Sequence, residues 1–385
     1  MMRIGIDFTA GMWQGAGIGR YTRELVQAAA LAAPDMALHL FFAAGGLDPQ
    51  SPFARYAHAL AAAHPNITLR PIPISPRLLT ILWQRLRLPL RVEWLIGPLD
   101  VVHAPDFVLP PTQARTLLTI HDLTFLVEPA CAEPNLRRYL SEAVPRSLRR
   151  ADLIVVDSKA TANDLGKLYG IPSRRIRLLY PAVDQRFRPM PATETAPLRE
   201  RLRLPDRFLL FVGTLEPRKN LTRLFQAFAL LRADYPDLHL VIAGRRGWLY
   251  DEIFATVDRC GLRERVHFLD FVADDDLPAL YNLAEAFVYP SLYEGFGFPV
   301  LEALACGTPV VTAKVASLPE VAGSAAIMVD PHEVEDIAAG IRAALTDPEP
   351  LRADGPPQAA TFRWEQTGQA LVAIYRELAA KAAAT

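Results

Sequence analysis

The chain has 385 residues, 51% of them hydrophobic, and a formal net charge of −1 at pH 7. This length is too great for one ordinary core and predicts two domains, while the near-neutral charge argues against nucleic-acid binding. The N-terminus enters a strand pattern at once and no apolar run is long enough to cross a bilayer, so we expect a cytoplasmic protein without a signal peptide. The three cysteines (Cys131, Cys260 and Cys306) fit neither a disulfide framework nor a zinc site.

Apolar strand-like runs alternate with helical patterns along almost the whole chain, which predicts an α/β protein whose parallel sheets carry helices on both faces. The strands expected in the first half cover residues 3–8, 38–43, 66–71, 101–104, 116–120, 153–157 and 177–180. Those expected in the second half cover residues 208–213, 238–244, 266–271, 286–290, 309–313 and 326–329. The expected helices include residues 21–33, 135–149, 219–233, 277–284, 332–346 and 361–383.

Residues 185–206 are rich in proline, charge and small residues and lack a strong apolar period, which is typical of a linker. We therefore expect two doubly wound, Rossmann-like domains at residues 1–190 and 191–365, and a C-terminal helix at 366–385 that packs back across the linker. Two such domains direct the carboxyl ends of their strands toward a shared cleft, where ligands bind.

Glu294 and Glu302 stand eight positions apart in segment 291–310, with a glycine-rich turn and a proline-started helix between them. Gly295 and Gly297 let the backbone approach a ligand, and the free N–H groups of the first helical turn attract an anion. Glu302, which we place in that first turn, is suited to accept hydrogen bonds from a diol such as ribose. We expect Glu294, before the turn, to face the group that lies on the other side of the ligand's phosphates. Alone, each glutamate is explained by the helix dipole or by a solvated loop, but together these features indicate a nucleotide-sugar site.

Two turns of the first half follow strands and carry polar or glycine-rich patterns. Gly15, Gly17 and Gly19 form a G-x-G-x-G run set too late after its strand for a dinucleotide fingerprint, so NAD binding is disfavoured and a phosphate-binding loop remains open. His121 stands beside Asp122 at a strand end, where it is either a sugar contact or a structural residue.

Arg218 and Lys219 open a helix after strand 208–213. Cations at the N-terminus of a helix are mildly unfavourable against the helix dipole. This misfit favours a role in binding an anionic ligand, such as a departing diphosphate, over the alternative of an exposed basic helix start. The Asp-Asp-Asp run at 274–276 directly precedes a helix, so capping explains it better than a metal site, and we expect no metal or other cofactor.

Residues 205–380 resemble, in order, the retaining glycosyltransferases of family 4, which have the GT-B fold of two Rossmann-like domains facing a central cleft. The matching strings are 211–220, 241–250, 266–281, 291–310 with its E-x7-E spacing, 317–323 and 329–331. The first half matches more loosely, at 15–20, 121–122 and 157–158. The resemblance implies that residues 1–190 form the acceptor side and residues 191–365 hold the nucleotide-sugar donor.

The resemblance also implies roles for the matching residues. Glu302 would bond the ribose, and Glu294 would bond a hydroxyl of the donor sugar. Arg218 and Lys219 would hold the diphosphate, and they carry more of its charge because Thr214 stands where many members have arginine. The other residues placed at the donor by the resemblance are Gly17 across the cleft, His121 near the reacting carbon, and Gly295, Phe296, Gly297 and Leu301.

The implied activity is a metal-independent hexosyl transfer with retention of anomeric configuration. The form of residues 213–220 is similar to that of polysaccharide-building mannosyltransferases, which makes GDP-mannose the first expected donor and a UDP-sugar the second. Alternatives on the same fold are a nucleotide-sugar 2-epimerase or hydrolase, and an inactive nucleotide-sugar-binding subunit.

The expected acceptor is a glycan or a lipid-linked glycan. Segment 77–96 mixes arginines with leucine and tryptophan, so it is either a helix pair packed on the core or an amphipathic surface for peripheral contact with the inner face of the membrane.

Overall fold

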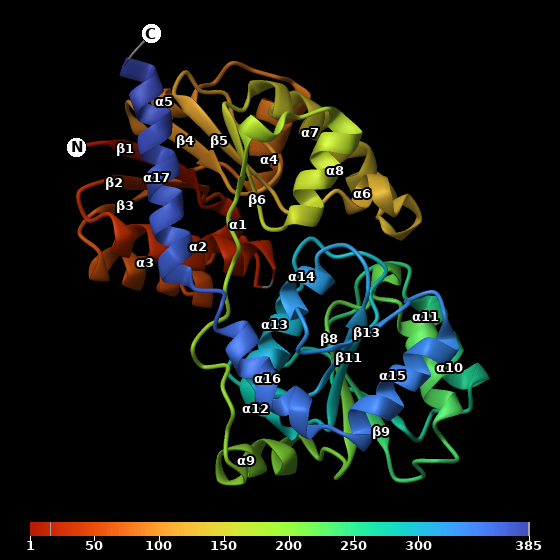
Figure 1. Cartoon of the computed structure of the whole chain (residues 1–385). Helices are drawn as coiled ribbons and strands as arrows, with labels where there is room; N and C mark the ends of the chain where they lie inside the picture. Colours follow the sequence, from red (N-terminus) through yellow and green to blue (C-terminus); the bar gives the residue numbers. More distant parts are fainter. Residues whose placement is uncertain (16, 384–385) are drawn as a thin grey trace. The chain divides into compact units, whose positions relative to one another are not determined.

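The computed structural model describes residues 1–15 and 17–383, which pack into two compact units (Figure 1). The first unit comprises Met1–Leu123, Asn135–Pro181 and the C-terminal residues from Arg363. The second comprises Thr124–Pro134 and Ala182–Phe362. Each unit is built on one parallel sheet covered by helices.

The first unit has a seven-stranded sheet in the order β3-β2-β1-β4-β5-β6-β7, with every neighbouring pair parallel. Its strands are β1 (Arg3–Asp7), β2 (Ala37–Ala43), β3 (Ile67–Ile72), β4 (Val101–Ala104), β5 (Arg115–Ile120), β6 (Leu153–Val156) and β7 (Ile176–Leu178). Its helices are α1 (Thr9–Trp13), α2 (Ile18–Ala32), α3 (Pro52–Ala63), α4 (Pro76–Thr80), the π-helical turn η1 (Ile81–Arg85), α5 (Val92–Ile96), α7 (Pro134–Arg150), α8 (Lys159–Tyr169), the 3-10 turn η3 (Ser173–Arg175) and α17 (Trp364–Ala383).

The second unit has a six-stranded sheet in the order β10-β9-β8-β11-β12-β13, again parallel throughout. Its strands are β8 (Phe208–Val212), β9 (His239–Ala243), β10 (Val266–Phe268), β11 (Ala286–Tyr289), β12 (Val310–Ala313) and β13 (Ile327–Val329). Its helices are α6 (Thr124–Val127), η2 (Pro129–Cys131), α9 (Ala192–Leu202), η4 (Pro217–Lys219), α10 (Leu221–Leu230), α11 (Asp251–Arg259), α12 (Leu277–Leu283), α13 (Phe298–Ala305), α14 (Leu318–Ala322), α15 (Val334–Thr346) and α16 (Glu349–Ala359).

Each sheet reverses its winding direction once. In the first sheet the reversal lies between β1 and β4, and in the second between β8 and β11. At such a switch point the loops after the two strands diverge to opposite faces and leave a crevice, which is where open α/β sheets bind ligands.

The predicted parallel α/β architecture is confirmed, and β1–β13 correspond to the thirteen expected strands. The linker prediction for residues 185–206 is wrong in part, because this segment contains helix α9. Thr195 and Leu198 of α9 are buried and the helix packs against α12, so tertiary burial produces a helix where the local pattern is weak. The segment Thr124–Pro134, which the sequence places in the first domain, packs with the second unit.

Helix α17 returns to the first unit and runs along α2 (Figure 1). Gly368 makes this close approach feasible, because a Cβ at this position would lie 2.4 Å from the carbonyl oxygen of Ala28. The hydroxyl of Tyr375 lies 2.8 Å from Nδ1 of buried His103. Residues 384–385, which the sequence includes in this helix, lie outside the described residues.

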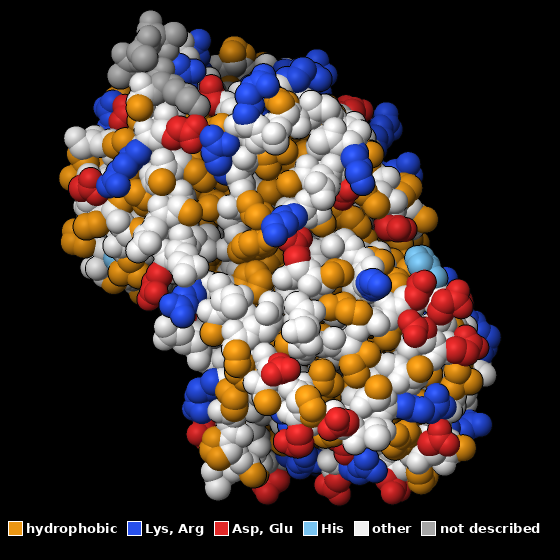
Figure 2. Space-filling view, in the orientation of Figure 1, with side chains coloured by type: hydrophobic (Ala, Val, Ile, Leu, Met, Phe, Trp, Pro, Cys, Tyr) orange, Lys and Arg blue, Asp and Glu red, His pale blue; other side chains and the backbone are white. Residues whose placement is uncertain are grey.

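The face drawn in Figure 2 mixes acidic and basic side chains over both units, as the net charge of −1 leads one to expect. In the described part of the chain, no helix combines the length and apolarity needed to cross a membrane.

Candidate functional site

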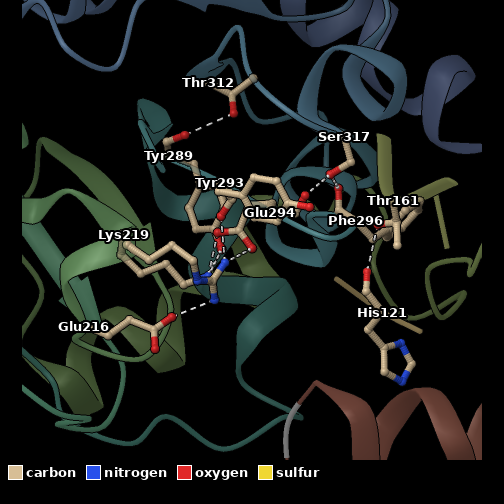
Figure 3. A network of polar contacts seen from close by, with 11 residues as sticks. His121, Thr161, Glu216, Lys219, Tyr289, Tyr293, Glu294, Phe296, Thr312 and Ser317 are labelled. Carbon is tan, nitrogen blue, oxygen red and sulfur yellow. Dashed lines mark hydrogen bonds and ion pairs between the residues drawn. The ribbon is translucent and has the colours of Figure 1, made fainter. Parts of the chain in front are cut away.

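Lys219 and Glu294 meet in the second unit, where the loops after β8 and β11 come together (Figure 3). Nζ of Lys219 donates a hydrogen bond of 2.7 Å to Oε1 of Glu294 and one of 2.5 Å to the hydroxyl of Tyr289. All three residues are buried. A buried ion pair therefore occupies the switch point of the second sheet.

Arg218 extends this pair into a network. Its Nη1 lies 2.6 Å from Oε2 of Glu294 and donates to the carbonyl oxygen of Tyr293 at 2.8 Å, while its Nη2 lies 2.6 Å from Oε1 of Glu216. Glu294 thus bridges both cations, and the two carboxylates balance the two positive charges. Such a buried network is stable only while all partners remain, because each charge has lost its water.

The network determines the charge of Glu294. Burial would raise the pKa of Glu294, but the charges of Arg218 and Lys219, with the hydrogen bond from Lys219, lower it to about 2. Burial and the neighbouring Arg218 lower the pKa of Lys219, while Glu294 opposes them. Glu294 is therefore ionised at neutral pH, so it accepts hydrogen bonds and is unsuited to act as a general acid.

The glycine turn that leads into α13 has a fixed shape. Gly297 has φ +107°, and a Cβ there would lie 2.8 Å from Cδ2 of Leu318, so glycine is required on both conformational and steric grounds. Oγ of Ser317 lies 2.9 Å and 2.7 Å from the carbonyl oxygens of Glu294 and Phe296 (Figure 3). The backbone of the turn is thus held by the residue before α14.

Glu302 lies within α13 and is 2% exposed. The prediction that places it in the first helical turn is wrong, because the helix already begins at Phe298 and Glu302 falls in the second turn. Its Oε2 accepts a hydrogen bond of 2.8 Å from the hydroxyl of buried Tyr281. Pro299 does lie in the first turn, as expected, and Leu301 is fully buried beside Glu302 in the helix.

In the first unit, His121 follows β5 and Asp157 follows the adjacent strand β6. Nδ1 of His121 lies 2.5 Å from Oδ2 of Asp157, and Nε2 lies 2.8 Å from the carbonyl oxygen of Pro105. Burial would lower the pKa of His121, but the charge and hydrogen bond of Asp157 raise it to about 9. Both nitrogens of the imidazolium are therefore engaged. The predicted sugar contact stays a prediction, and it requires Nε2 to exchange its partner.

Gly17 precedes helix α2 and has φ +52°, with no atom within 4 Å of a Cβ built on it. It is exposed at the start of a 15-residue helix, whose N-terminal N–H groups favour an anion. Ala16, in the same predicted loop, lies outside the described residues. The role of Gly17 also stays a prediction.

Sequence reasoning missed three side chains that hold the site together. Tyr289 bonds Lys219, Glu216 pairs with Arg218, and Tyr281 bonds Glu302. The sequence carries one pattern that could have identified Tyr289 and Glu216, because each is a polar side chain at or just after the end of an apolar strand.

The acidic run at 274–276 forms no site in the structure. Asp276 stands at the N-cap of α12 without a side-chain capping bond and pairs with Arg201, and Asp275 pairs with Arg186. The prediction of a helix start is confirmed, because Asp276 is the N-cap residue, but the expected capping bond is not formed, since its carboxylate pairs with Arg201. Across residues 1–15 and 17–383, no three His, Cys, Asp or Glu side chains gather as a set that could hold a metal ion.

Segment 77–96 forms short elements that bury one side and expose the other. It spans α4, η1 and α5, and it buries Leu79, Trp83 and Val92 in a core cluster with β2 and β4 residues. The expectation that the segment packs on the core is confirmed for these residues, and contact with a membrane stays a prediction. The exposed outer residues, called the leucine-arginine surface below, are Arg77, Leu78, Arg85, Leu86, Arg87, Leu88, Leu90, Trp94 and Leu95.

Two family models match the chain in succession. The model described as "Glycosyltransferase Family 4" matches residues 15–187, and the model described as "Glycosyl transferases group 1" matches residues 194–357. Among solved structures, sucrose-phosphate synthase from Thermosynechococcus elongatus superposes with a TM-score of 0.74 at 22% identity, covering 99% of this chain and 100% of that one. This likeness establishes the GT-B fold.

One curated relative extends the match over 94% of the chain. O-antigen chain mannosyltransferase B of Escherichia coli is 36% identical over 94% of this chain and 96% of its own length. The serotype-specific mannosyltransferase WbdA of E. coli is 36% identical over 66% of this chain, which spans 32% of that longer protein. The agreement of both models and of a relative matched from end to end shows that this chain belongs to glycosyltransferase family 4.

Proposed function

We propose that this protein transfers mannose from GDP-mannose to a glycan or lipid-linked glycan, with retention of anomeric configuration and without a metal ion. The observation that carries the proposal is the buried pair of cations, Arg218 and Lys219, held by Glu294 at the switch point of the second sheet. The choice of mannose rests on the end-to-end similarity to an O-antigen mannosyltransferase.

The cations suit the charge that develops during the transfer. Breaking the bond between the anomeric carbon and the diphosphate oxygen leaves negative charge on the diphosphate and positive charge on the sugar. Lys219 uses two of its three N–H donors for Glu294 and Tyr289, and the remaining N–H has no partner among the described residues. Prepositioned positive charge of this kind stabilises a leaving diphosphate.

Retention follows if the acceptor oxygen attacks the face that the diphosphate leaves. The acceptor oxygen forms the new bond to the anomeric carbon, the bond to the diphosphate oxygen breaks, and the departing oxygen takes the acceptor's proton. This route needs no protein nucleophile. Because the pKa of Glu294 is about 2, its carboxylate is suited to accept a hydrogen bond from a donor-sugar hydroxyl.

Glu302 completes the nucleotide side in this proposal. Its buried carboxylate is oriented by Tyr281 and is suited to accept hydrogen bonds from ribose hydroxyls. The backbone of Gly295 and Gly297 supplies the close approach between the two glutamates. Gly17 and His121, in the first unit, keep their proposed donor roles on the strength of the family resemblance.

The leucine-arginine surface supports a further part of the proposal, peripheral contact with an anionic membrane that carries a lipid-linked acceptor. Exposed leucines and Trp94 lie among Arg85, Arg87 and Arg91, and the guanidinium of Arg91 lies 5.3 Å from the centre of the Trp94 ring. The one acidic residue of the segment, Glu93, is half-buried, and its carboxylate accepts hydrogen bonds from Thr112 and from the backbone N–H groups at 113 and 114, so basic residues outnumber it on the exposed surface. Basic and apolar side chains together favour an anionic bilayer surface.

A donor screen tests the proposal directly. Thermal unfolding with GDP, UDP, GDP-mannose and UDP-glucose should give the largest rise in Tm with the guanosine compounds. Incubation of GDP-mannose with a mannose-terminated acceptor in EDTA should yield an α-linked product by NMR. A β-linked product would overturn the proposed retention, and loss of activity in EDTA would overturn metal independence. Epimerisation of the donor in the absence of acceptor would identify an epimerase instead of a transferase.

A further inference from the structure

A cavity of about 480 Å³ lies in the first unit, at the switch point between β1 and β4. Asp7 ends β1 and Asp106 follows β4. The two residues are 99 positions apart in the sequence, but both line the cavity because their strands are adjacent in the sheet. The size is typical of small-ligand sites. The remaining lining comes mainly from α1, α4, η1 and α7.

The aromatic part of the lining presents carbon surfaces. Trp13 and Trp83 line the cavity, but their indole N–H groups donate to the carbonyl oxygens of Ala43 at 2.8 Å and Leu90 at 2.9 Å. These bonds hold the rings in place. The indole N–H groups are therefore used, and only the carbon surfaces of the rings are presented to the cavity. Such surfaces favour the C–H faces of a sugar ring or another apolar group.

The polar part of the lining is acidic. Asp7 accepts hydrogen bonds from the backbone N–H and from the side-chain hydroxyl of Thr9, and the Asp106 carboxylate accepts none from the residues that the structure describes. The hydroxyl of Tyr139, also in the lining, makes no hydrogen bond within the described residues either. Burial, together with the charge of Asp106, raises the pKa of Asp7 to about 6, and burial also raises the pKa of Asp106. The Asp106 carboxylate and the Tyr139 hydroxyl are therefore two groups of the lining that keep their full hydrogen-bonding capacity for a ligand.

The lining contains no cation. No lysine, arginine or histidine is among its described residues, and the charge of His121, which acts on Asp106 from outside the lining, is already paired with Asp157, so a phosphate or carboxylate ligand would meet net negative charge. Hydroxyl groups, in contrast, donate to carboxylates and satisfy them. Carboxylate acceptors combined with fixed aromatic surfaces are the chemistry that recognises an uncharged sugar.

We propose that this cavity binds the uncharged terminal sugar of the acceptor, with Asp7 and Asp106 accepting hydrogen bonds from its hydroxyls. The inference rests on the proposed glycosyl transfer and adds the class of acceptor: neutral at its terminal ring and without phosphate on that ring. The residues that line the cavity all belong to the first unit, whereas Arg218, Lys219 and Glu294 belong to the second.

The first test measures binding without turnover, so that it stands apart from the transfer reaction. Saturation-transfer NMR of the full chain with methyl α-mannoside, a mannose disaccharide and mannose 6-phosphate should show contact with the first two and none with the third. The variant Asp106→Asn keeps the side-chain size and should abolish or strongly weaken the signal. The exposed Asp48→Asn is the matched control and should leave it unchanged.

The second test uses turnover. Asp106→Asn and Asp7→Asn should each raise the KM for acceptor about tenfold or more, because a hydrogen bond to a charged group is lost, while the KM for GDP-mannose stays within twofold. An unchanged acceptor KM would refute the site, and so would tighter binding of an amino sugar than of mannose, which would identify a cation pocket. If sugars bind by NMR but GDP-mannose is no donor, the transfer proposal fails and the cavity assignment stands.

Discussion

The Nζ atom of Lys219 lies 2.7 Å from Oε1 of Glu294, and this contact joins residues 75 positions apart across the switch point of the second sheet. The same carboxylate lies 2.6 Å from Arg218, so one glutamate holds both cations. In the proposed function, this carboxylate accepts a hydrogen bond from the donor sugar while the two cations hold the diphosphate. The carboxylate restrains the cations before any donor arrives, and its variants separate diphosphate binding from sugar recognition.

Glu294→Gln should therefore lower turnover without weakening nucleotide binding. The amide keeps the side-chain size but leaves two buried cations without their shared anion, which should lower the free energy of unfolding by about 3 kcal/mol. Turnover should fall about 100-fold, because the sugar loses a charged acceptor. Affinity for free GDP, measured by calorimetry, should stay equal or rise, since the cations now face the diphosphate alone.

The exposed Glu264→Gln is the control for that experiment and should match the wild type in all three measurements. Normal turnover in a folded Glu294→Gln protein would remove Glu294 from the reaction. A loss of GDP affinity would indicate instead that Glu294 organises the cations for the diphosphate.

Lys219→Met should lose diphosphate binding itself. The variant removes a buried charge that bonds both Glu294 and Tyr289, so affinity for GDP and for inorganic diphosphate should each fall tenfold or more, roughly the loss expected for one charged hydrogen bond. Lys314→Met, at an exposed lysine of the same unit, supplies the control. Equal binding of inorganic diphosphate by both variants would show that Lys219 is structural.

Glu302→Gln should separate the nucleoside from the diphosphate. In the proposed arrangement Glu302 contacts ribose, so its variant should bind GDP about tenfold more weakly and bind inorganic diphosphate normally. Tyr281→Phe removes the hydroxyl that bonds Glu302 and should show the same pattern with a smaller effect. Calorimetry with both ligands decides the matter, and a parallel loss of diphosphate affinity would place Glu302 elsewhere in the site.

The His121–Asp157 pair should make the stability of the first unit depend on alkaline pH. The folded-state pKa of His121 is about 9, above its ordinary 6.5, so the folded state holds the proton more tightly. The stabilisation is complete below about pH 6.5 and is lost as pH rises through about 9. Urea unfolding measured across this range should show the fall in the wild type and in the exposed control His58→Asn. Asp157→Asn should be less stable and nearly flat, and a steep fall in that variant would assign the effect to another group.

The strands and the donor segment were predictable because they depend on local patterns. Buried parallel strands are short apolar runs, and the turn that carries Gly297 and Glu294 has a recognisable order of residues. The charge state of the site was not predictable in the same way. Only the fold shows that both oxygens of Glu294 are engaged, and only the second turn of α13 brings Glu302 to Tyr281.

The cavity of the first unit was even less predictable from local sequence patterns. Asp7 and Asp106 come together because β1 and β4 are neighbours, and strand order is a property of the whole sheet that no local segment reveals. His121 and Asp157 likewise depend on the pairing of β5 with β6. Helix α9 was missed for the opposite reason, since its local sequence is weak and its burial against α12 decides its conformation.

The leucine-arginine surface should bind anionic vesicles. Full-length protein should co-sediment with phosphatidylglycerol vesicles at low salt, bind phosphatidylcholine vesicles weakly, and be released as salt screens the arginines. Trp94→Ser with Leu95→Ser should reduce binding about tenfold, because two exposed apolar side chains no longer enter the interface. Leu168→Ser, at an exposed leucine of the same unit outside the surface, should bind like the wild type. Equal sedimentation of all three proteins would refute membrane contact through this surface.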